Sequence, residues 1–75
     1  MKEGRIARLL RDVNPAAFAR AILVHETTVQ RWQEGLTLPY PSIHRVIAMK
    51  LGLPFEEVRD AYRADRADRK ARRSP

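Results

Sequence analysis

The apolar residues of the chain recur at every third or fourth position, which is the spacing of one face of a helix. Near the start, for example, these positions are Ile6, Leu9, Leu10 and Val13. No segment alternates between apolar and polar residues as a half-buried β-strand does. The sequence therefore predicts an all-α protein. The predicted helices cover residues 3–12, 15–22, 26–34, 43–51 and a fifth segment that begins at Pro54.

Capping residues mark where these helices begin and end. Asn14 followed by Pro15 predicts the start of the second helix, because Asn caps helix N-termini and Pro suits the first helical position. Gly35 and Gly52 predict the ends of the third and fourth helices, because glycine readily takes the left-handed conformation found there. Ser42 is the expected cap of the fourth helix, after the proline-containing loop "LTLPYP".

The fifth helix changes character partway along. Phe55, Val58 and Tyr62 are expected to point inward, but no apolar stripe continues beyond them. Residues 63–75 hold six Lys or Arg residues against two Asp, a net charge of +4. We therefore predict a domain over residues 1–62, followed by a basic C-terminal tail or helix extension over 63–75. Two acid-before-base pairs favour helix slightly: Asp65 with Arg69, and Asp68 with Arg72.

The composition is that of a small globular domain. Of the 75 residues, 44% are hydrophobic and 32% are charged, and none is cysteine, which excludes disulfides and thiolate–zinc sites. No apolar run approaches the roughly 20 residues that cross a membrane, and the N-terminus lacks a signal-peptide apolar region. We therefore expect a cytoplasmic protein with no membrane partner. The net charge of +6 indicates a polyanionic partner such as nucleic acid, although residues 1–62 carry only +2 of it.

The second and third predicted helices stand unusually close together. Only a three-residue turn separates residues 15–22 from residues 26–34, and this is helix-turn-helix geometry. Such a unit needs buried residues where its helices cross and a small residue at the closest approach, which Ala19 supplies. The residues expected to be buried there are Phe18, Ile22, Val24, Val29 and Trp32.

With these features, the chain resembles the lambda-repressor-like helix-turn-helix family of Cro and phage-repressor (XRE) type over about residues 2–62. The resemblance is carried by "FARAILVHETTVQRWQEG", by the proline-containing loop, and by "PSIHRVIAMKLGLPFEEV". It implies a compact five-helix DNA-binding domain with the helix-turn-helix at its second and third helices.

Three residues depart from the family pattern. Leu23 stands where the family usually has a glycine of positive φ, so we expect a strain of roughly 1–2 kcal/mol there. Pro15 replaces a glutamine that contacts phosphate, and His25 replaces the usual Ser or Thr cap of the recognition helix. A capping box of Thr27 with Gln30 is therefore an alternative start for that helix.

The resemblance also implies which side chains meet DNA. In this family the first turns of the third helix enter the major groove. By position, the expected base readers are Glu26, Thr27, Gln30 and Arg31, whose side chains can pair with base edges. The expected phosphate contacts are Asn14, Thr28, Thr37 and Tyr40. By contrast, we expect Trp32 in the core and His44 exposed.

The resulting hypothesis is a sequence-specific regulator of transcription that binds double-stranded DNA, with its recognition helix at about 26–34. Because 75 residues leave no room for a ligand or cleavage domain, we favour a small Cro-like repressor of phage or bacterial type. Many members of the family bind palindromic operators as homodimers. The alternatives are an antitoxin-like protein-interaction module and an excisionase-like architectural DNA binder.

An enzyme is not expected. The two histidines, His25 and His44, have no metal-ligand spacing, Glu56 and Glu57 point in different directions on a helix, and no glycine-rich phosphate loop is present. We accordingly expect no catalytic residue, metal, cofactor or small-molecule ligand.

Overall fold

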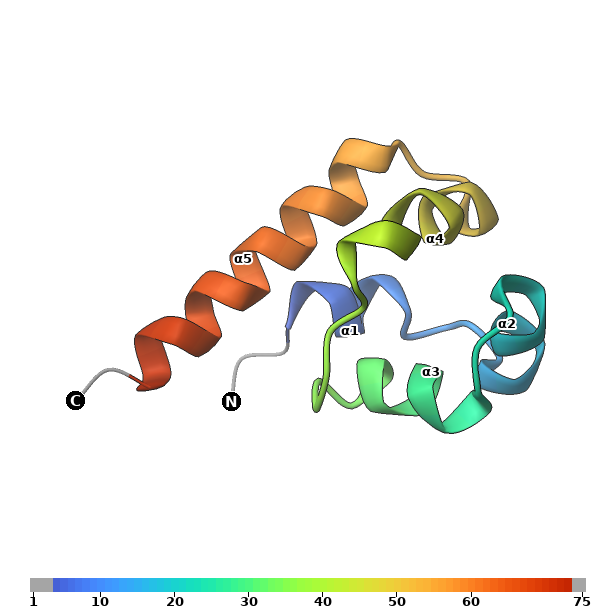
Figure 1. Cartoon of the computed structure of the whole chain (residues 1–75), viewed down its shortest axis with the longest axis horizontal. Coiled ribbons are helices and arrows are strands. Elements are labelled where there is room, and N and C mark those ends of the chain that lie inside the picture. The colour runs from blue at the N-terminus through green and yellow to red at the C-terminus, as the bar shows by residue number, and fades with distance from the viewer. Residues whose placement is uncertain (1–3, 74–75) are drawn as a thin grey trace.

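The helix boundaries largely follow the capping residues of the sequence. The computed structural model describes residues 4–73, with side chains for residues 4–71. Within this part of the chain there is no β-strand, and the predicted all-α class is confirmed. The elements are α1 (Arg5–Leu9), α2 (Pro15–Ile22), α3 (Glu26–Gln33), a 3₁₀ turn (Pro41–Ile43), α4 (His44–Leu51) and α5 (Phe55–Arg73) (Figure 1).

Local chemistry fixes both ends of several helices. The side-chain oxygen of Asn14 accepts a hydrogen bond from the backbone N–H of Ala17 at 3.0 Å, with Pro15 at the first position of α2. Gly35 and Gly52 have φ of 76° and 72° after α3 and α4, where a residue with a Cβ would be strained. The predicted second helix and the predicted glycine stops are therefore confirmed.

The expected Ser42 cap of α4 is wrong. Ser42 lies inside the 3₁₀ turn, and the start of α4 has no side-chain cap. The turn runs directly into α4, so backbone carbonyls serve its first N–H groups. Ile43 N–H donates to the carbonyl of Tyr40, and His44 N–H donates to that of Pro41.

The first helix is shorter than the predicted 3–12, of which residue 3 lies outside the described residues. α1 ends at Leu9, and the chain then turns through Leu10 to Val13. This leaves two carbonyls without helical partners, and a side chain from α3 satisfies both of them. The Gln33 amide nitrogen donates to the Leu10 and Val13 carbonyls at 2.8 and 3.0 Å.

One hydrophobic core joins all five helices. α1 lies between α3 and α5, α2 packs on α3 and α4, and α4 packs on α5 (Figure 1). The predicted crossing of α2 and α3 is confirmed, with Ala19, Val29 and Trp32 almost fully buried and Val24 half-buried. The fully assembled core comprises Ile6, Leu10, Phe18, Ala19, Ile22, Val29, Trp32, Ile47, Ala48, Val58 and Ala61.

α5 continues without a break across residue 62. It reaches Arg73, so residues 63–73 extend the helix rather than form a separate tail, while residues 74–75 lie outside the described part. The carboxylate of Asp65, only 6% exposed, accepts hydrogen bonds from the backbone N–H groups of Arg5 and Ile6 at 2.8 and 2.9 Å. A residue of α5 thus caps the N-terminus of α1, where unpaired N–H groups favour a negative charge.

The predicted pairing of Asp65 with Arg69 is wrong for the same reason. The Asp65 carboxylate is occupied by α1, and the Arg69 guanidinium turns to the loop after α3. It donates to the carbonyls of Gly35 and Leu36, two groups that the end of α3 leaves without helical donors. For the other predicted pair, the side chain of Arg72 lies outside those described.

His44 is buried, which corrects the expectation of an exposed side chain. It is 2% exposed and its Nε2 lies 3.0 Å from the carbonyl oxygen of Pro39. Its ring meets Tyr62 edge-on, with 4.5 Å between centroids. The burial is possible because the loop carbonyl satisfies the polar ring.

Candidate nucleic-acid interface

A tight turn holds α3 in place after α2. Leu23 has φ 62° and ψ 46°, the left-handed conformation expected at this position. This conformation lets the N–H groups of Leu23 and Val24 both donate to the carbonyl of Ala19. The Leu23 side chain is 91% exposed, so no packing compensates for the strain of a Cβ at positive φ.

The two faces of α3 have different chemistry. Val29 and Trp32 are 0% and 2% exposed and anchor the inner face. At about 100° per residue, the opposite face collects five polar side chains within roughly 140° of arc. These are Glu26, Thr27, Gln30, Arg31 and Glu34, all exposed except Gln30, which is half-buried.

The four expected base readers therefore lie together on one solvent-facing surface. Two of them are coupled, because the Gln30 amide nitrogen donates to the carboxylate of Glu26 at 3.1 Å. This bond restricts both side chains and leaves the Gln30 amide oxygen and one of its N–H bonds unused. Arg31 is exposed in the last turn of α3 and supplies the positive charge among the four readers.

The alternative capping box of Thr27 with Gln30 is not formed. α3 begins at Glu26, its N-cap is His25, and no side chain caps it. Instead, the carbonyl of His25 accepts from the backbone N–H groups of Thr28 and Val29 at 3.0 and 3.3 Å. Thr27 is thus not committed to a cap and remains on the exposed face.

The four expected phosphate contacts lie on three separate segments. Asn14 precedes α2 and uses its side-chain oxygen as the cap, which leaves its amide nitrogen available. Thr28 is half-buried within α3, whereas Thr37 and Tyr40 are exposed in the loop that follows, Tyr40 at 66%. Their arrangement places hydrogen-bonding groups at both ends of the α2–α3 unit.

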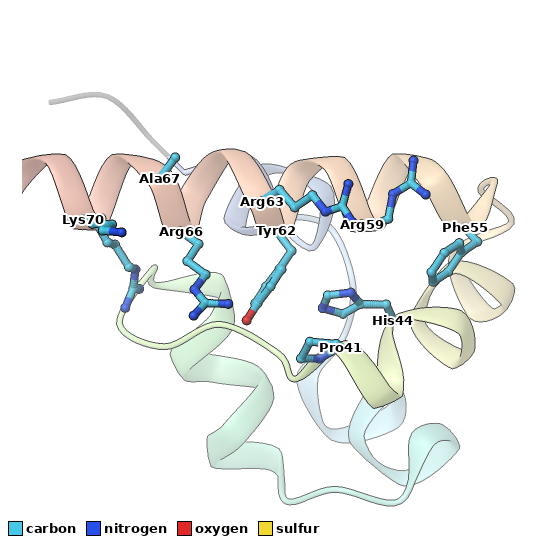
Figure 2. A pocket seen from close by; sticks show the side chains of 10 residues that line it. Pro41, His44, Phe55, Arg59, Tyr62, Arg63, Arg66, Ala67 and Lys70 are labelled. Carbon is cyan, nitrogen blue, oxygen red and sulfur yellow. The ribbon is translucent and has the colours of Figure 1, made fainter.

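A second surface was missed by reasoning from the sequence. A cleft of about 910 Å³ lies between α5, the 3₁₀ turn and the start of α4, and five basic residues line it (Figure 2). The signal is present in the sequence, because basic residues at 59, 63, 66 and 70 follow helical spacing. A domain boundary predicted at residue 62 divides these four residues between two segments and so conceals their common face.

The described part of the chain offers neither a metal centre nor a membrane span. Residues 4–73 contain no group of three or more His, Cys, Asp or Glu side chains arranged to hold a metal ion. None of the helices in this range combines the length and the apolar character needed to cross a membrane.

Together, the fold and this site define a small all-α protein in which a short turn presents one polar helix face to solvent. Comparisons with family models, curated proteins and solved structures gave no match to the chain. We therefore infer its function from the chemistry and placement of its own residues.

Proposed function

We propose that this protein is a sequence-specific regulator of transcription that binds double-stranded DNA through a lambda-repressor-like helix-turn-helix. One observation carries the proposal. The left-handed turn at Leu23 and the buried pair Val29 and Trp32 hold α3 so that its polar face is solvent-exposed. α3 would lie in the major groove, as the recognition helix of such a unit does.

The chemistry of this face suits base readout. A guanidinium such as that of Arg31 can pair bidentately with guanine, and an amide such as that of Gln30 can pair with adenine. The bond between Gln30 and Glu26 fixes the amide before binding, which lowers the conformational entropy lost on association. Glu26 accepts hydrogen bonds but repels phosphates, so it contributes to discrimination more than to affinity.

The proposed phosphate contacts set the position of α3 rather than its sequence preference. The Asn14 amide nitrogen at the start of α2 and the hydroxyls of Thr37 and Tyr40 after α3 would hold the two sides of the unit. Thr28, half-buried, contributes less than these exposed groups.

A small Cro-like repressor acting as a homodimer on a palindromic operator is the form that we favour. The apolar residues of α5 that could form a dimer surface are already used within the monomer. Val58 is fully buried, and Phe55 lies beneath the guanidinium groups of Arg45 and Arg59. A dimer would therefore use other surfaces, such as that around Met49, which is 69% exposed.

The alternatives receive less support. An excisionase-like binder would usually place a β-wing after the helix-turn-helix, but residues 36–73 contain only helices, turns and loops. An antitoxin-like module would need a protein-binding surface, and the exposed apolar residues that could anchor one, such as Leu36 and Met49, lie outside the polar face of α3.

The test is selection of binding sites from random duplex DNA, followed by measurement of affinity at two salt concentrations. We expect a defined consensus that is lost in the variant Gln30→Ala/Arg31→Ala. The matched control is Arg8→Ala/Lys50→Ala, in exposed residues of α1 and α4. Binding without a consensus, or a consensus that survives the α3 variant, would overturn the proposal.

A further inference from the structure

α5 separates its charges onto two flanks. Its basic flank consists of Arg59, Arg63, Arg66 and Lys70, whose spacing of four, three and four residues keeps them within roughly 60° around the helix. Apart from the buried Asp65, the acidic residues occupy the adjoining arc of the same helix, which begins about 20° from the basic flank. They are Glu56, Glu57, Asp60 and Asp68.

The basic flank forms one wall of the cleft. Figure 2 shows its side chains beside Tyr62, with His44 and Pro41 on the facing wall. Among the residues that the structure describes, none of those lining this cleft is acidic. Charges of one sign beside a concave surface reinforce one another's field, so the cleft favours an anion.

Two of the cations are available for a partner. Among the residues that the structure describes, Arg63 and Arg66 are exposed and make no hydrogen bond or ion pair. Arg59 is held beside Asp60 at 3.2 Å, and Arg69 is committed to the loop after α3. Arg63 and Arg66 are therefore the strongest candidates for binding an external anion.

The helix that carries them is fixed in place. Asp65 ties α5 to the start of α1, and Arg69 ties it to the loop that begins at Gly35. Both contacts lie within the segment of α5 that presents Arg63, Arg66 and Lys70. The helix backbone beneath the basic flank is thus preorganised, so binding orders only the arginine and lysine side chains.

We propose that the basic flank binds the phosphate backbone of duplex DNA, next to the segment that α3 reads. The position of this contact along the DNA, beside α3, rests on the proposed function. Arg59 to Lys70 spans roughly 16 Å along α5, and one DNA strand presents a phosphate about every 3.4 Å of axis. The flank lacks an exposed large apolar residue, whereas protein interfaces are centred on such anchors. The facing wall begins at Pro41, directly after Tyr40, so the flank extends the proposed phosphate-contacting loop.

The experiment compares the full chain with the variant Arg63→Gln/Arg66→Gln. The control Arg8→Gln/Lys50→Gln removes the same charge from exposed residues elsewhere. The probe is a duplex of arbitrary sequence, titrated at several salt concentrations. The slope of log affinity against log salt is negative, and we expect its magnitude to decrease by roughly 0.9 for each phosphate that the variant no longer neutralises, so by near 1.8 for the double variant. The slope of the control variant should change by less than half as much. Circular dichroism should give equal melting temperatures for all three proteins.

Three results would overturn the proposal. One is an unchanged slope in the Arg63/Arg66 variant. Another is an equal decrease in the magnitude of the slope in the control, which would show that the effect depends on net charge and not on the position of the charges. The third is weakened binding of a poly-glutamate peptide with unchanged DNA binding, which would indicate an acidic protein partner. Because the probe has arbitrary sequence, a failed search for a consensus would reject base reading by α3 without deciding this test.

Discussion

Replacing Asp65 tests whether a buried carboxylate from α5 holds the first helix. In Asp65→Ala, the backbone N–H groups of Arg5 and Ile6 lose their acceptor. The site is closely built, since a Cβ on Gly4 would lie 3.2 Å from Asp65 Oδ2.

The expected loss of stability follows from these two bonds. A hydrogen bond to a charged group contributes about 1.5–3 kcal/mol, and removal of an N-cap side chain costs about 0.5–2 kcal/mol. Because both bonds serve one helix end, we expect a total of about 2–4 kcal/mol rather than their full sum. A chain of this size has about 4–11 kcal/mol of stability, so the melting temperature should fall by roughly 10–25 °C.

The assay is urea and thermal unfolding followed by circular dichroism. Asp68→Ala is the matched control, because Asp68 is exposed one turn further along the same helix and gains the same helix propensity. It should change stability by less than about 0.5 kcal/mol. Asp65→Asn should fall between the two, since its amide offers one acceptor oxygen. A destabilisation in Asp65→Ala no larger than that in Asp68→Ala would refute the capping role.

Three other predictions follow from single residues. Leu23→Gly should leave the melting temperature unchanged or raise it, because relief of the backbone strain at Leu23, roughly 1–2 kcal/mol, exceeds glycine's entropy cost of about 0.5–1 kcal/mol. A decrease in melting temperature as large as that of the control Ala21→Gly, inside α2, would contradict this prediction. Arg31→Ala should weaken the free energy of binding to the preferred duplex by about 1–3 kcal/mol and relax the sequence preference at one base pair. Equal weakening on every sequence would instead identify Arg31 as a phosphate contact. Gln33→Ala should destabilise by about 1–3 kcal/mol in urea unfolding, because the Val13 carbonyl loses its donor and the Leu10 carbonyl keeps only the N–H of Val13. An effect no larger than that of Gln30→Ala would contradict this role.

The sequence by itself determined the features that depend on interactions between residues close together in the chain. The Asn14 cap, the glycine stops at Gly35 and Gly52, and the inner face of α3 each depend on residues within a turn or two. Even the left-handed Leu23 could be expected, because the helix-turn-helix family that the sequence resembles usually has a glycine of positive φ at this position. For the same reason the exposed face of α3, with Arg31, could be predicted from the sequence.

Only the tertiary structure decided the long-range polar contacts. Asp65 caps a helix that begins 60 residues earlier, and Gln33 serves carbonyls 23 and 20 residues away. In the sequence, each of these side chains looks like an ordinary polar residue on a solvated helix face. The periodicity of a sequence predicts which apolar residues are buried, but it does not predict which polar groups will meet. Burial of His44 depended in the same way on the Pro39 carbonyl. These pairings exist because folding brings unpaired backbone groups at helix ends and in loops beside side chains that can satisfy them, and no local pattern specifies which ones will meet.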